Sequence, residues 1–248
     1  MFSSSAMHWD FALILFFLAV AVPILGRRRI RLLMQGPDTT RMERLSLYAS
    51  TISFQWLAAG LILWRCSVHR VLPAQLGLAL PRPALTLIVF VALSALILAN
   101  QLVSLRRLAA QPELAQGFVP QLARKIFPRD TIERLAFFPL VLTVALCEEF
   151  VYRGFAQHVF QSWSRDSLIV GILASAAMFS LAHLYQGPKG LASTFVIGLV
   201  FSVVRAWTGS LFAPFGAHFV ADITVGFLAP RRLGVTKSSQ LTESKQFD

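Results

Sequence analysis

The sequence predicts an all-α protein, a polytopic transmembrane helical bundle of about seven to eight spans. Hydrophobic residues make up 56% of the 248-residue chain and charged residues only 14%, and the mean hydropathy is +0.63. This balance is not that of a soluble domain. The apolar residues also fall in runs close to the roughly 20 residues that a helix needs to cross a bilayer. The runs are apolar throughout, whereas strands of a membrane β-barrel alternate with period two.

Seven runs are predicted as spans, and the sixth is the shortest: 11–26, 45–64, 85–103, 135–155, 168–184, 191–204 and 211–228. We expect one helical domain with three segments. Residues 1–130 hold the N-terminal spans and an interfacial segment, 131–230 hold a helical core, and 231–248 form a polar tail. The first run is predicted to be a retained span, because its arginine cluster follows the apolar residues, whereas a signal peptide carries its positive charge before them.

The basic residues predict the orientation. Of the 23 Lys and Arg residues, 17 lie in connectors on one side of the predicted spans, five lie on the other, and Arg153 lies inside a span. Because Lys and Arg in short flanking loops stay in the cytoplasm, we expect the N-terminus outside and the tail in the cytoplasm of a bacterial-type plasma membrane. The net charge of +11 then indicates contact with anionic lipid head groups. No nucleic-acid-binding module is visible, so nucleic acid is not an expected partner.

The connector 109–134 has an amphipathic character. Its apolar residues recur near helical spacing beside three cations, which is typical of a helix lying in the membrane interface. These apolar residues are Leu114, Phe118, Val119, Leu122, Ile126 and Phe127, and the cations are Arg124, Lys125 and Arg129. An ordinary loop is the alternative.

The fourth run contains two adjacent carboxylates and an arginine, Glu148, Glu149 and Arg153. Ionisable groups at bilayer depth are costly and therefore candidates for function. On a helix, residues 149 and 153 share a face, so we expect Glu149 and Arg153 to pair, which leaves Glu148 for other work. A purely structural ion pair is the alternative.

Two histidine motifs lie in later runs. His183 follows Phe179 by four residues near the end of the fifth run, and alone it is weak evidence of function. His218 and Asp222 are four apart in the seventh run and share a helical face. A carboxylate that accepts from one ring nitrogen leaves the other nitrogen aimed at substrate, water or metal.

Together, Glu-Glu-x-x-x-Arg at 148–153, Phe-x-x-x-His at 179–183 and His-x-x-x-Asp at 218–222 resemble the CPBP family of intramembrane peptidases. This family includes the type II CAAX prenyl endopeptidases and bacteriocin self-immunity proteins. The resemblance covers roughly residues 135–228, with the three motifs in the family's order. Each motif is weak alone, but the ordered set on membrane spans is fairly specific.

The resemblance implies an intramembrane endopeptidase that acts on membrane-associated, possibly lipidated, peptide substrates without a cofactor. Glu148 would activate water, His183 would hold or polarise it, and His218 would stabilise the oxyanion. The family often has Asn where this chain has Asp222, which here is expected to orient His218 because an ionised carboxylate cannot donate. Glu149 and Arg153 would balance charge, or Arg153 would contact a substrate carboxylate.

Other chemistries and roles compete with this interpretation. Zinc held by Glu148, His183 and His218 is one, although no His-Glu-x-x-His run favours it. A Cys147 nucleophile is disfavoured by its neighbour Glu148. A proton-coupled transporter would be expected to show internal repeats, and none is found. A catalytically inactive scaffold or immunity protein would keep the fold without needing Glu148.

The predicted spans contain one inconsistency, because they put Glu148 and His183 at depths that differ by about 15 Å. We therefore predict that the fourth helix is longer than its apolar run and extends over residues 131–162. Glu148 then moves toward the centre of the bilayer and toward His183.

Overall fold

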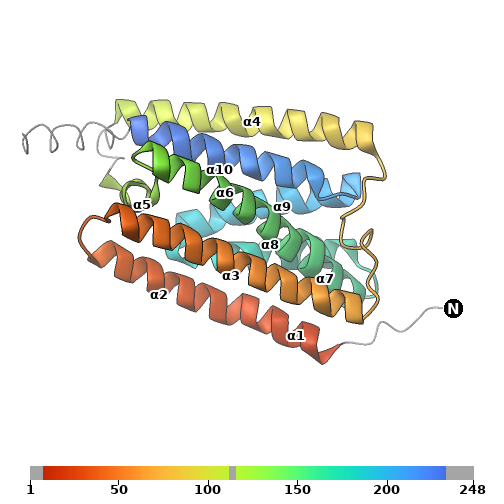
Figure 1. The fold of residues 1–248 in the computed structure, drawn as a ribbon. Helices are drawn as coiled ribbons and strands as arrows, with labels where there is room; N and C mark the ends of the chain where they lie inside the picture. Colours follow the sequence, from red (N-terminus) through yellow and green to blue (C-terminus); the bar gives the residue numbers. More distant parts are fainter. Residues whose placement is uncertain (1–7, 112–115, 233–248) are drawn as a thin grey trace, which may run out of the picture.

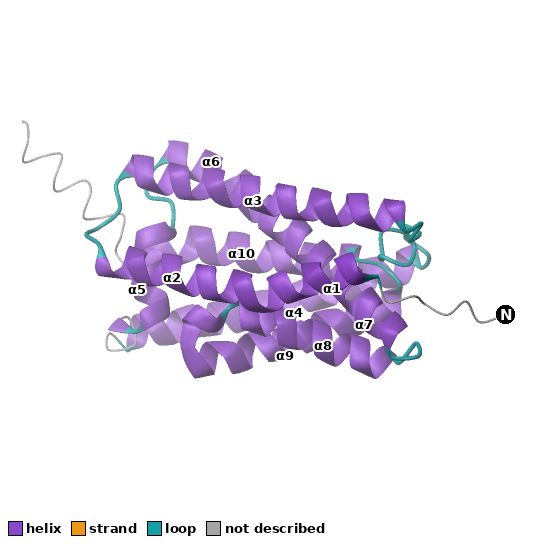
Figure 2. Ribbon diagram, turned by 90° about the horizontal axis from the view of Figure 1, so that it is seen from below, coloured by secondary structure: helices purple, strands orange, loops and turns teal. Residues whose placement is uncertain are grey.

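The computed structural model describes residues 8–111 and 116–232, and every regular element in these residues is a helix (Figures 1 and 2). The predicted all-α class is confirmed. The elements, in chain order, are α1 (Trp9–Phe16), the π-helical turn η1 (Phe17–Ala21), α2 (Val22–Gln35), α3 (Arg41–Val68), α4 (Pro83–Ala110), α5 (Phe118–Ile126), α6 (Thr131–Glu148), the π-helical segment η3 (Glu149–Ala156), α7 (Gln157–Trp163), α8 (Leu168–Ala182), the 3-10 turn η4 (Leu184–Gln186), α9 (Gly187–Thr208) and α10 (Phe212–Arg232).

The chain is an integral membrane protein with seven apolar helical segments in its described part. Five are long enough to span a bilayer: Trp9–Gln35, Arg41–Val68, Pro83–Leu108, Thr131–Trp163 and Leu184–Thr208. The other two, Leu168–Ala182 and Phe212–Leu228, are shorter. Each of the seven predicted runs therefore corresponds to a helix, and most of the helices extend beyond their apolar runs.

Two helices have boundaries that differ by several residues from those of the predicted runs. The first helix continues from the predicted 11–26 to Gln35, because arginine side chains can extend away from a helix end while the backbone stays helical. The fourth runs without interruption from Thr131 to Trp163 through α6, η3 and α7. The predicted long helix is confirmed, although its middle is π-helical.

The helices pack in a bundle that joins both consecutive and distant elements. Helix α8 contacts its neighbours in sequence, α7 and α9, whereas the contacts of α3 with α6 and of α10 with α4 join helices that are distant in sequence; Figure 1 shows α4 and α10 side by side along one edge. Helix α2 likewise packs on the distant α5, α8 and η4. The connection 36–40 and α5 lie at one end of the bundle, called here the α5 end, and the turn between α7 and α8 lies at the other (Figure 1).

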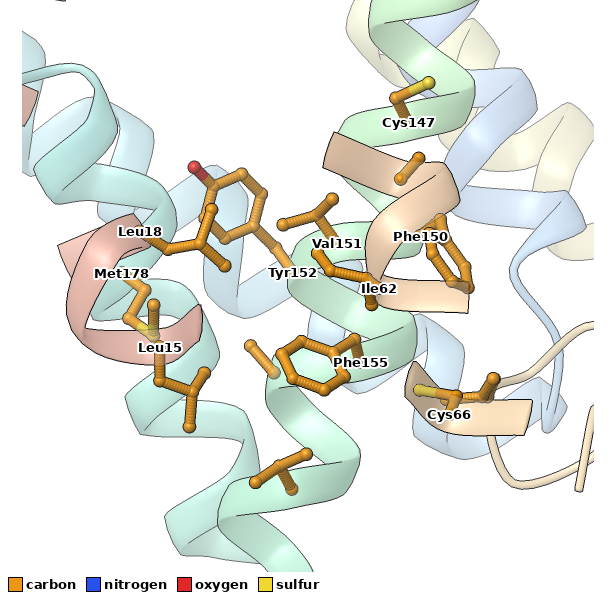
Figure 3. Packing of buried hydrophobic residues seen from close by; sticks show 14 of the residues in the cluster. Leu15, Leu18, Ile62, Cys66, Cys147, Phe150, Val151, Tyr152, Phe155 and Met178 are labelled. Atoms are coloured by element: carbon orange, nitrogen blue, oxygen red, sulfur yellow. The ribbon is translucent and has the colours of Figure 1, made fainter. Parts of the chain in front are cut away.

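The half of the bundle next to the α7–α8 turn is filled by side chains. Leu15, Ile62, Phe155 and Met178 come from α1, α3, η3 and α8 and meet in one hydrophobic cluster (Figure 3). Phe155 is completely buried. Because truncating a large buried side chain leaves a cavity and typically costs several kcal/mol, roughly 3–5 for Phe to Ala, this cluster fixes the four elements relative to one another.

The α5 end is fastened by polar contacts. Lys125 donates to the carbonyls of Gly36 and Pro37 over 2.6 and 2.8 Å, and Tyr48 donates to the carbonyl of Ile126 over 2.6 Å. Leu122 is buried. The helix predicted within the connector 109–134 is therefore confirmed for Phe118–Ile126, and the alternative of an ordinary loop does not apply there. Leu114 lies outside the described residues. The polar tail predicted for 231–248 lies outside them from residue 233 onward.

Candidate functional site

A cavity of about 700 Å³ lies in the half of the bundle nearer α5. Its walls come from α2, α3, α5, α6, α10 and η4 and are mainly apolar, including Val22, Leu25, Leu140, Val144 and Val225. Four polar side chains that the sequence singled out also line it, namely Glu148, His183, His218 and Asp222. A largely apolar cavity with a few convergent polar groups is typical of a ligand or active site.

The α7–α8 hairpin brings Glu148 and His183 to the same depth. Glu148 lies 15 residues before Trp163, where α7 ends, and His183 lies 15 residues after Leu168, where α8 begins. Helix α8 is only about 22 Å long, so it stops within the roughly 30 Å of bilayer hydrocarbon. Its irregular end is tolerated at that depth because it lines a cavity.

A glycine permits the close packing of this hairpin. A Cβ atom at Gly171 of α8 would lie 2.9 Å from the carbonyl oxygen of Gln157 in α7, closer than side-chain carbons approach in real proteins. Without a side chain at this position the two helices can touch along their backbones. The small residue therefore positions both Glu148 and His183.

Glu148 is half-buried and faces a partner that the sequence argument missed. Its Oε1 accepts a hydrogen bond from Nε2 of Gln55 over 3.1 Å. Gln55 lies in α3 and also lines the cavity. The signal was available, because an amide in the otherwise apolar run 45–64 needs a partner at bilayer depth.

His183 is held by its own helix. Its Nδ1 lies 2.8 Å from the carbonyl oxygen of Phe179, which can only accept. Nδ1 therefore carries the proton, and in the neutral ring Nε2 is left as an acceptor. This is the tautomer that can hold a water molecule by accepting one of its protons.

Glu149 joins Arg153 and His218. Its Oε1 accepts from Nη1 of Arg153 over 2.9 Å and from Nδ1 of His218 over 2.8 Å. The predicted pairing of Glu149 with Arg153 is present. Arg153 is completely buried, and its guanidinium carbon lies 4.0 Å from the centre of the Phe179 ring. In this arrangement Arg153 does not line the cavity, so its alternative role as a contact for a substrate carboxylate is not supported.

Asp222 makes a longer contact with the histidine. Its Oδ2 lies 3.5 Å from Nε2 of His218, and 38% of its side chain is exposed. Helical spacing predicts that Asp222 orients this ring, but the contact of His218 with Glu149, at 2.8 Å, is shorter than its contact with Asp222. Helical spacing shows only partners on the same helix, whereas Glu149 is 69 residues away along the chain.

The π-helical segment η3 begins at Glu149, directly after Glu148. All eight residues of this segment are buried, including Glu149 and Arg153. Single π-helical stretches inside α-helices are frequent at functional sites, because the wider turn redirects the side chains on either side of it. Glu148, just before the segment, lines the cavity, whereas Glu149, its first residue, contacts Arg153 and His218.

The zinc alternative was tested on the donor atoms. Among the described residues, no three His, Cys, Asp or Glu side chains are arranged so that they would hold a metal ion. Nδ1 of His218 and Nδ1 of His183 are held by Glu149 and by a backbone carbonyl, which leaves Nε2 of each ring as the atom that could ligate a metal. Glu148, His183 and His218 are not gathered into a metal site in this structure, and zinc binding stays a prediction for a metal assay.

The fold and the cavity define a helical membrane protein in which acidic residues and histidines meet inside the bundle. Residues 131–224 match the family model described as Type II CAAX prenyl endopeptidase Rce1-like. The match begins with α6 and ends within α10, so it contains all seven residues of the three motifs. The predicted resemblance is confirmed for this segment, and the matched family is one of CAAX proteases.

Two curated relatives are similar to part of the chain. The protein YpbD of Bacillus subtilis (strain 168), itself uncharacterized, is 30% identical over 105 residues, which are 40% of this chain and 47% of YpbD. An uncharacterized 24.3 kDa protein of Escherichia coli is 34% identical over 122 residues, 49% of this chain and 52% of the relative. The chain thus spans about half the length of the curated relatives that it matches. No solved structure matches it significantly.

Proposed function

We propose that the protein is an intramembrane endopeptidase in which Glu148 activates water against a peptide bond of a membrane-associated substrate. The observation that carries the proposal is the presence of Glu148, His183, His218 and Asp222 on the wall of one largely apolar cavity. The match of residues 131–224 to a protease family supports it.

The proposed reaction needs no group beyond this chain and water. Glu148 takes a proton from a water that also donates to Nε2 of His183, and the hydroxide attacks the carbonyl carbon. His218, held through Nδ1 by Glu149, donates from Nε2 to the oxyanion that forms. The proton on Glu148 then passes to the departing amine as the C–N bond breaks. Asp222 beside Nε2 keeps the imidazole protonated between turnovers.

The cavity walls indicate the class of substrate. Apolar side chains from five helices cover most of the surface between the catalytic group and the α5 end, which suits a peptide with a hydrophobic or lipid-modified segment. The α5 end carries most of the basic connectors, so in the proposed orientation the substrate enters from the cytoplasmic side.

Substitution of Glu148 tests the proposal most directly. Membranes of cells that make the native protein are compared by proteomics with membranes of cells that make Glu148→Gln or His183→Ala. We expect fragments that occur only with the native protein, and a loss of about 100-fold or more in the rate of their formation with either variant. The control, Glu43→Gln, changes an exposed carboxylate that caps α3 outside the cavity, and it should process substrate normally.

Two outcomes would contradict the proposal. Full processing by folded, inserted Glu148→Gln would show that Glu148 is not the base. Loss of activity on chelation with recovery on adding zinc would favour the metalloprotease. In both cases the unfolding midpoint in detergent is measured for each variant, so that loss of activity is separated from loss of fold.

A further inference from the structure

Tyr185 lies on the wall of the 700 Å³ cavity, beside the histidine of the second motif. It is the middle residue of η4, the 3-10 turn that follows α8. The centre of its ring lies 5.9 Å from the centre of the His183 ring. Tyr185 belongs to none of the three motifs, and the reaction proposed above does not use it.

The turn that carries Tyr185 is fixed by its backbone. The amide of Gln186 donates to the carbonyl oxygen of His183 over 2.9 Å, which closes the turn. Gly187, where α9 begins, has a φ angle of 76°, a left-handed conformation that glycine adopts without a steric penalty. Helix α2 also packs on η4. The side chains of Tyr185 and Gln186 are therefore held on the cavity wall.

The hydroxyl group of Tyr185 has a proton to donate. Its oxygen accepts a hydrogen bond from Nε2 of Gln186 over 3.3 Å, but a hydroxyl is also a donor. In the part of the chain that the structure describes, no acceptor lies within hydrogen-bond distance of this proton. Tyr48, which also lines the cavity, differs because it donates to the carbonyl oxygen of Ile126 over 2.6 Å. Tyr185 thus offers the cavity a donor that the protein does not occupy.

Tyr185 lies within electrostatic range of both Glu148 and Asp222. Glu148 is the proposed base, and Oδ2 of Asp222 lies 3.5 Å from Nε2 of His218, the nitrogen that is proposed to donate to the oxyanion. An ionised Asp222 can only accept hydrogen bonds, so His218 would be left as a single donor. Oxyanion sites generally combine several donors, and tyrosine is one of the side chains that they use.

We propose that Tyr185 is a further catalytic residue, whose hydroxyl donates a second hydrogen bond to the oxyanion. The proposal rests on the proposed function, because it adds a donor to the same reaction. When hydroxide adds to the carbonyl carbon, the π electron pair moves to the oxygen, which then accepts from Nε2 of His218 and from Oη of Tyr185. The pair returns when the C–N bond breaks. No covalent bond to Tyr185 forms or breaks, and its proton stays on Oη. Gln186 is a positioning residue, because it holds the oxygen of Tyr185.

The test uses full-length protein in detergent and a peptide that spans a cleavage site found by the proteomic comparison. Tyr185→Phe removes the hydroxyl and keeps the ring, so we expect kcat to fall about 100-fold while KM stays near its native value. Two inhibitors of the same sequence give a second readout. A phosphinate, which carries oxygens on a tetrahedral centre, should bind Tyr185→Phe less tightly by a similar factor. A reduced amide, which has no carbonyl oxygen, should bind both proteins alike.

The matched control is Tyr152→Phe, which removes a hydroxyl outside the cavity. Tyr152 packs in the hydrophobic cluster (Figure 3) and is not among the residues that line the cavity, so this variant should keep the native kcat. Gln186→Leu should lower kcat less than Tyr185→Phe does, because the donor is kept and only its support is lost. The unfolding midpoint of each variant is measured alongside.

The outcomes separate this proposal from the proposed function. A native kcat in folded Tyr185→Phe, or an equal loss of affinity for both inhibitors, would overturn the role of Tyr185 and leave Glu148 as the base. If the native protein produced no fragments that depend on Glu148, the proposed function itself would fail, and the role of Tyr185 with it.

Discussion

The long helix from Thr131 to Trp163 carries two buried glutamates that both pair with arginine but differ in how completely they are bonded. Glu133, near its start, accepts at Oε1 from Nη2 of Arg44 over 2.6 Å and at Oε2 from Nε of Arg44 over 3.0 Å. The backbone amide of Arg129 also donates to Oε2 over 2.7 Å. Both oxygens of Glu133 are occupied, and the pair fastens α3 to α6.

Glu149, in the middle of the same helix, is bonded less completely. Its Oε1 accepts from both Arg153 and His218, whereas Oε2 has no partner among the described residues. Nε and Nη2 of Arg153 also lack partners there, although the rings of Phe179 and Phe201 face the guanidinium. Unsatisfied buried polar atoms are rare and costly. The Glu149 pair also binds His218, which lines the cavity, whereas the hydrogen bonds of the Glu133 side chain end on Arg44 and on the backbone amide of Arg129.

The largest expected effect is on stability. Glu133→Ala leaves Arg44 buried without its partner, which should lower the free energy of unfolding by about 3–5 kcal/mol. The measurement is the unfolding transition in detergent. The double variant Arg44→Met/Glu133→Leu removes both charges and should lose much less. If the double variant is as unstable as the single one, then the packing around the pair, and not its charge, is what matters.

The second prediction concerns the incompletely bonded pair. Glu149→Gln keeps an oxygen that can accept from His218 but loses the negative charge, so the rate of proteolysis should fall about 10–100-fold. Its stability should fall less than that of Glu133→Ala, because fewer hydrogen bonds end on Glu149. Glu133→Gln is the matched variant, and it should lose stability and keep its rate per folded molecule. A native rate of proteolysis in Glu149→Gln would show that the charge of Glu149 matters no more to catalysis than that of Glu133.

The third prediction extends the comparison to Glu148, which precedes Glu149 and accepts one hydrogen bond from Gln55. Such a bond to a charged group is worth about 1.5–3 kcal/mol, so Gln55→Leu should lower kcat about tenfold or more while KM stays near its native value. Gln101→Leu is the control, because Gln101 also lies in a span but donates to the carbonyl of Ala221. A change in KM alone would instead assign Gln55 to substrate binding.

The smallest effect belongs to Asp130, which precedes the Glu133 end of the helix. Burial opposes ionisation, but hydrogen bonds from the amide of Glu133 and from Arg41 outweigh it and lower the pKa of Asp130. Its contribution to stability is therefore complete above its unfolded pKa of about 3.9 and is lost as the pH falls through the lower folded value. Asp130→Asn, which can still cap the helix, should cost under about 1 kcal/mol at pH 7. In acid unfolding experiments, the difference in the free energy of unfolding between Asp130→Asn and the native protein should vanish once the pH lies below the folded pKa of Asp130.

The sequence predicts the helical class and four of the polar residues on the cavity wall, Glu148, His183, His218 and Asp222, because charged and histidine side chains inside apolar runs are conspicuous. Glu148 and Glu149 with Arg153 stand out against Leu, Val and Phe, and the pairing of residues 149 and 153 follows from helical spacing. The depth conflict between Glu148 and His183 also predicted the long helix correctly. These inferences succeed because they depend on local spacing and on the cost of burying charge.

Contacts between distant helices could not be predicted in this way. Gln55 reaches Glu148 across 93 residues and His218 reaches Glu149 across 69, and no periodicity links such positions. Asp10 was missed for another reason. The first span was expected to begin at residue 11, yet Asp10 is buried in α1 and accepts from Arg65 over 2.7 Å. Acidic residues near the ends of apolar runs look like solvated connectors until the packing is known.

The π-helical segment has a consequence for how the length of this helix can vary. It contains one more residue in its turn than an α-helix would use, so deleting a single residue between Glu149 and Ala156 would let the helix become regular. Because the wider turn and the regular turn cover the same rotation, the parts of the helix before and after the deletion would keep their orientation. Only the side chains within the segment would change direction, Glu149 and Arg153 among them. A one-residue deletion there should therefore disturb the contacts of Glu149 with Arg153 and His218 while Glu148 stays on the cavity wall.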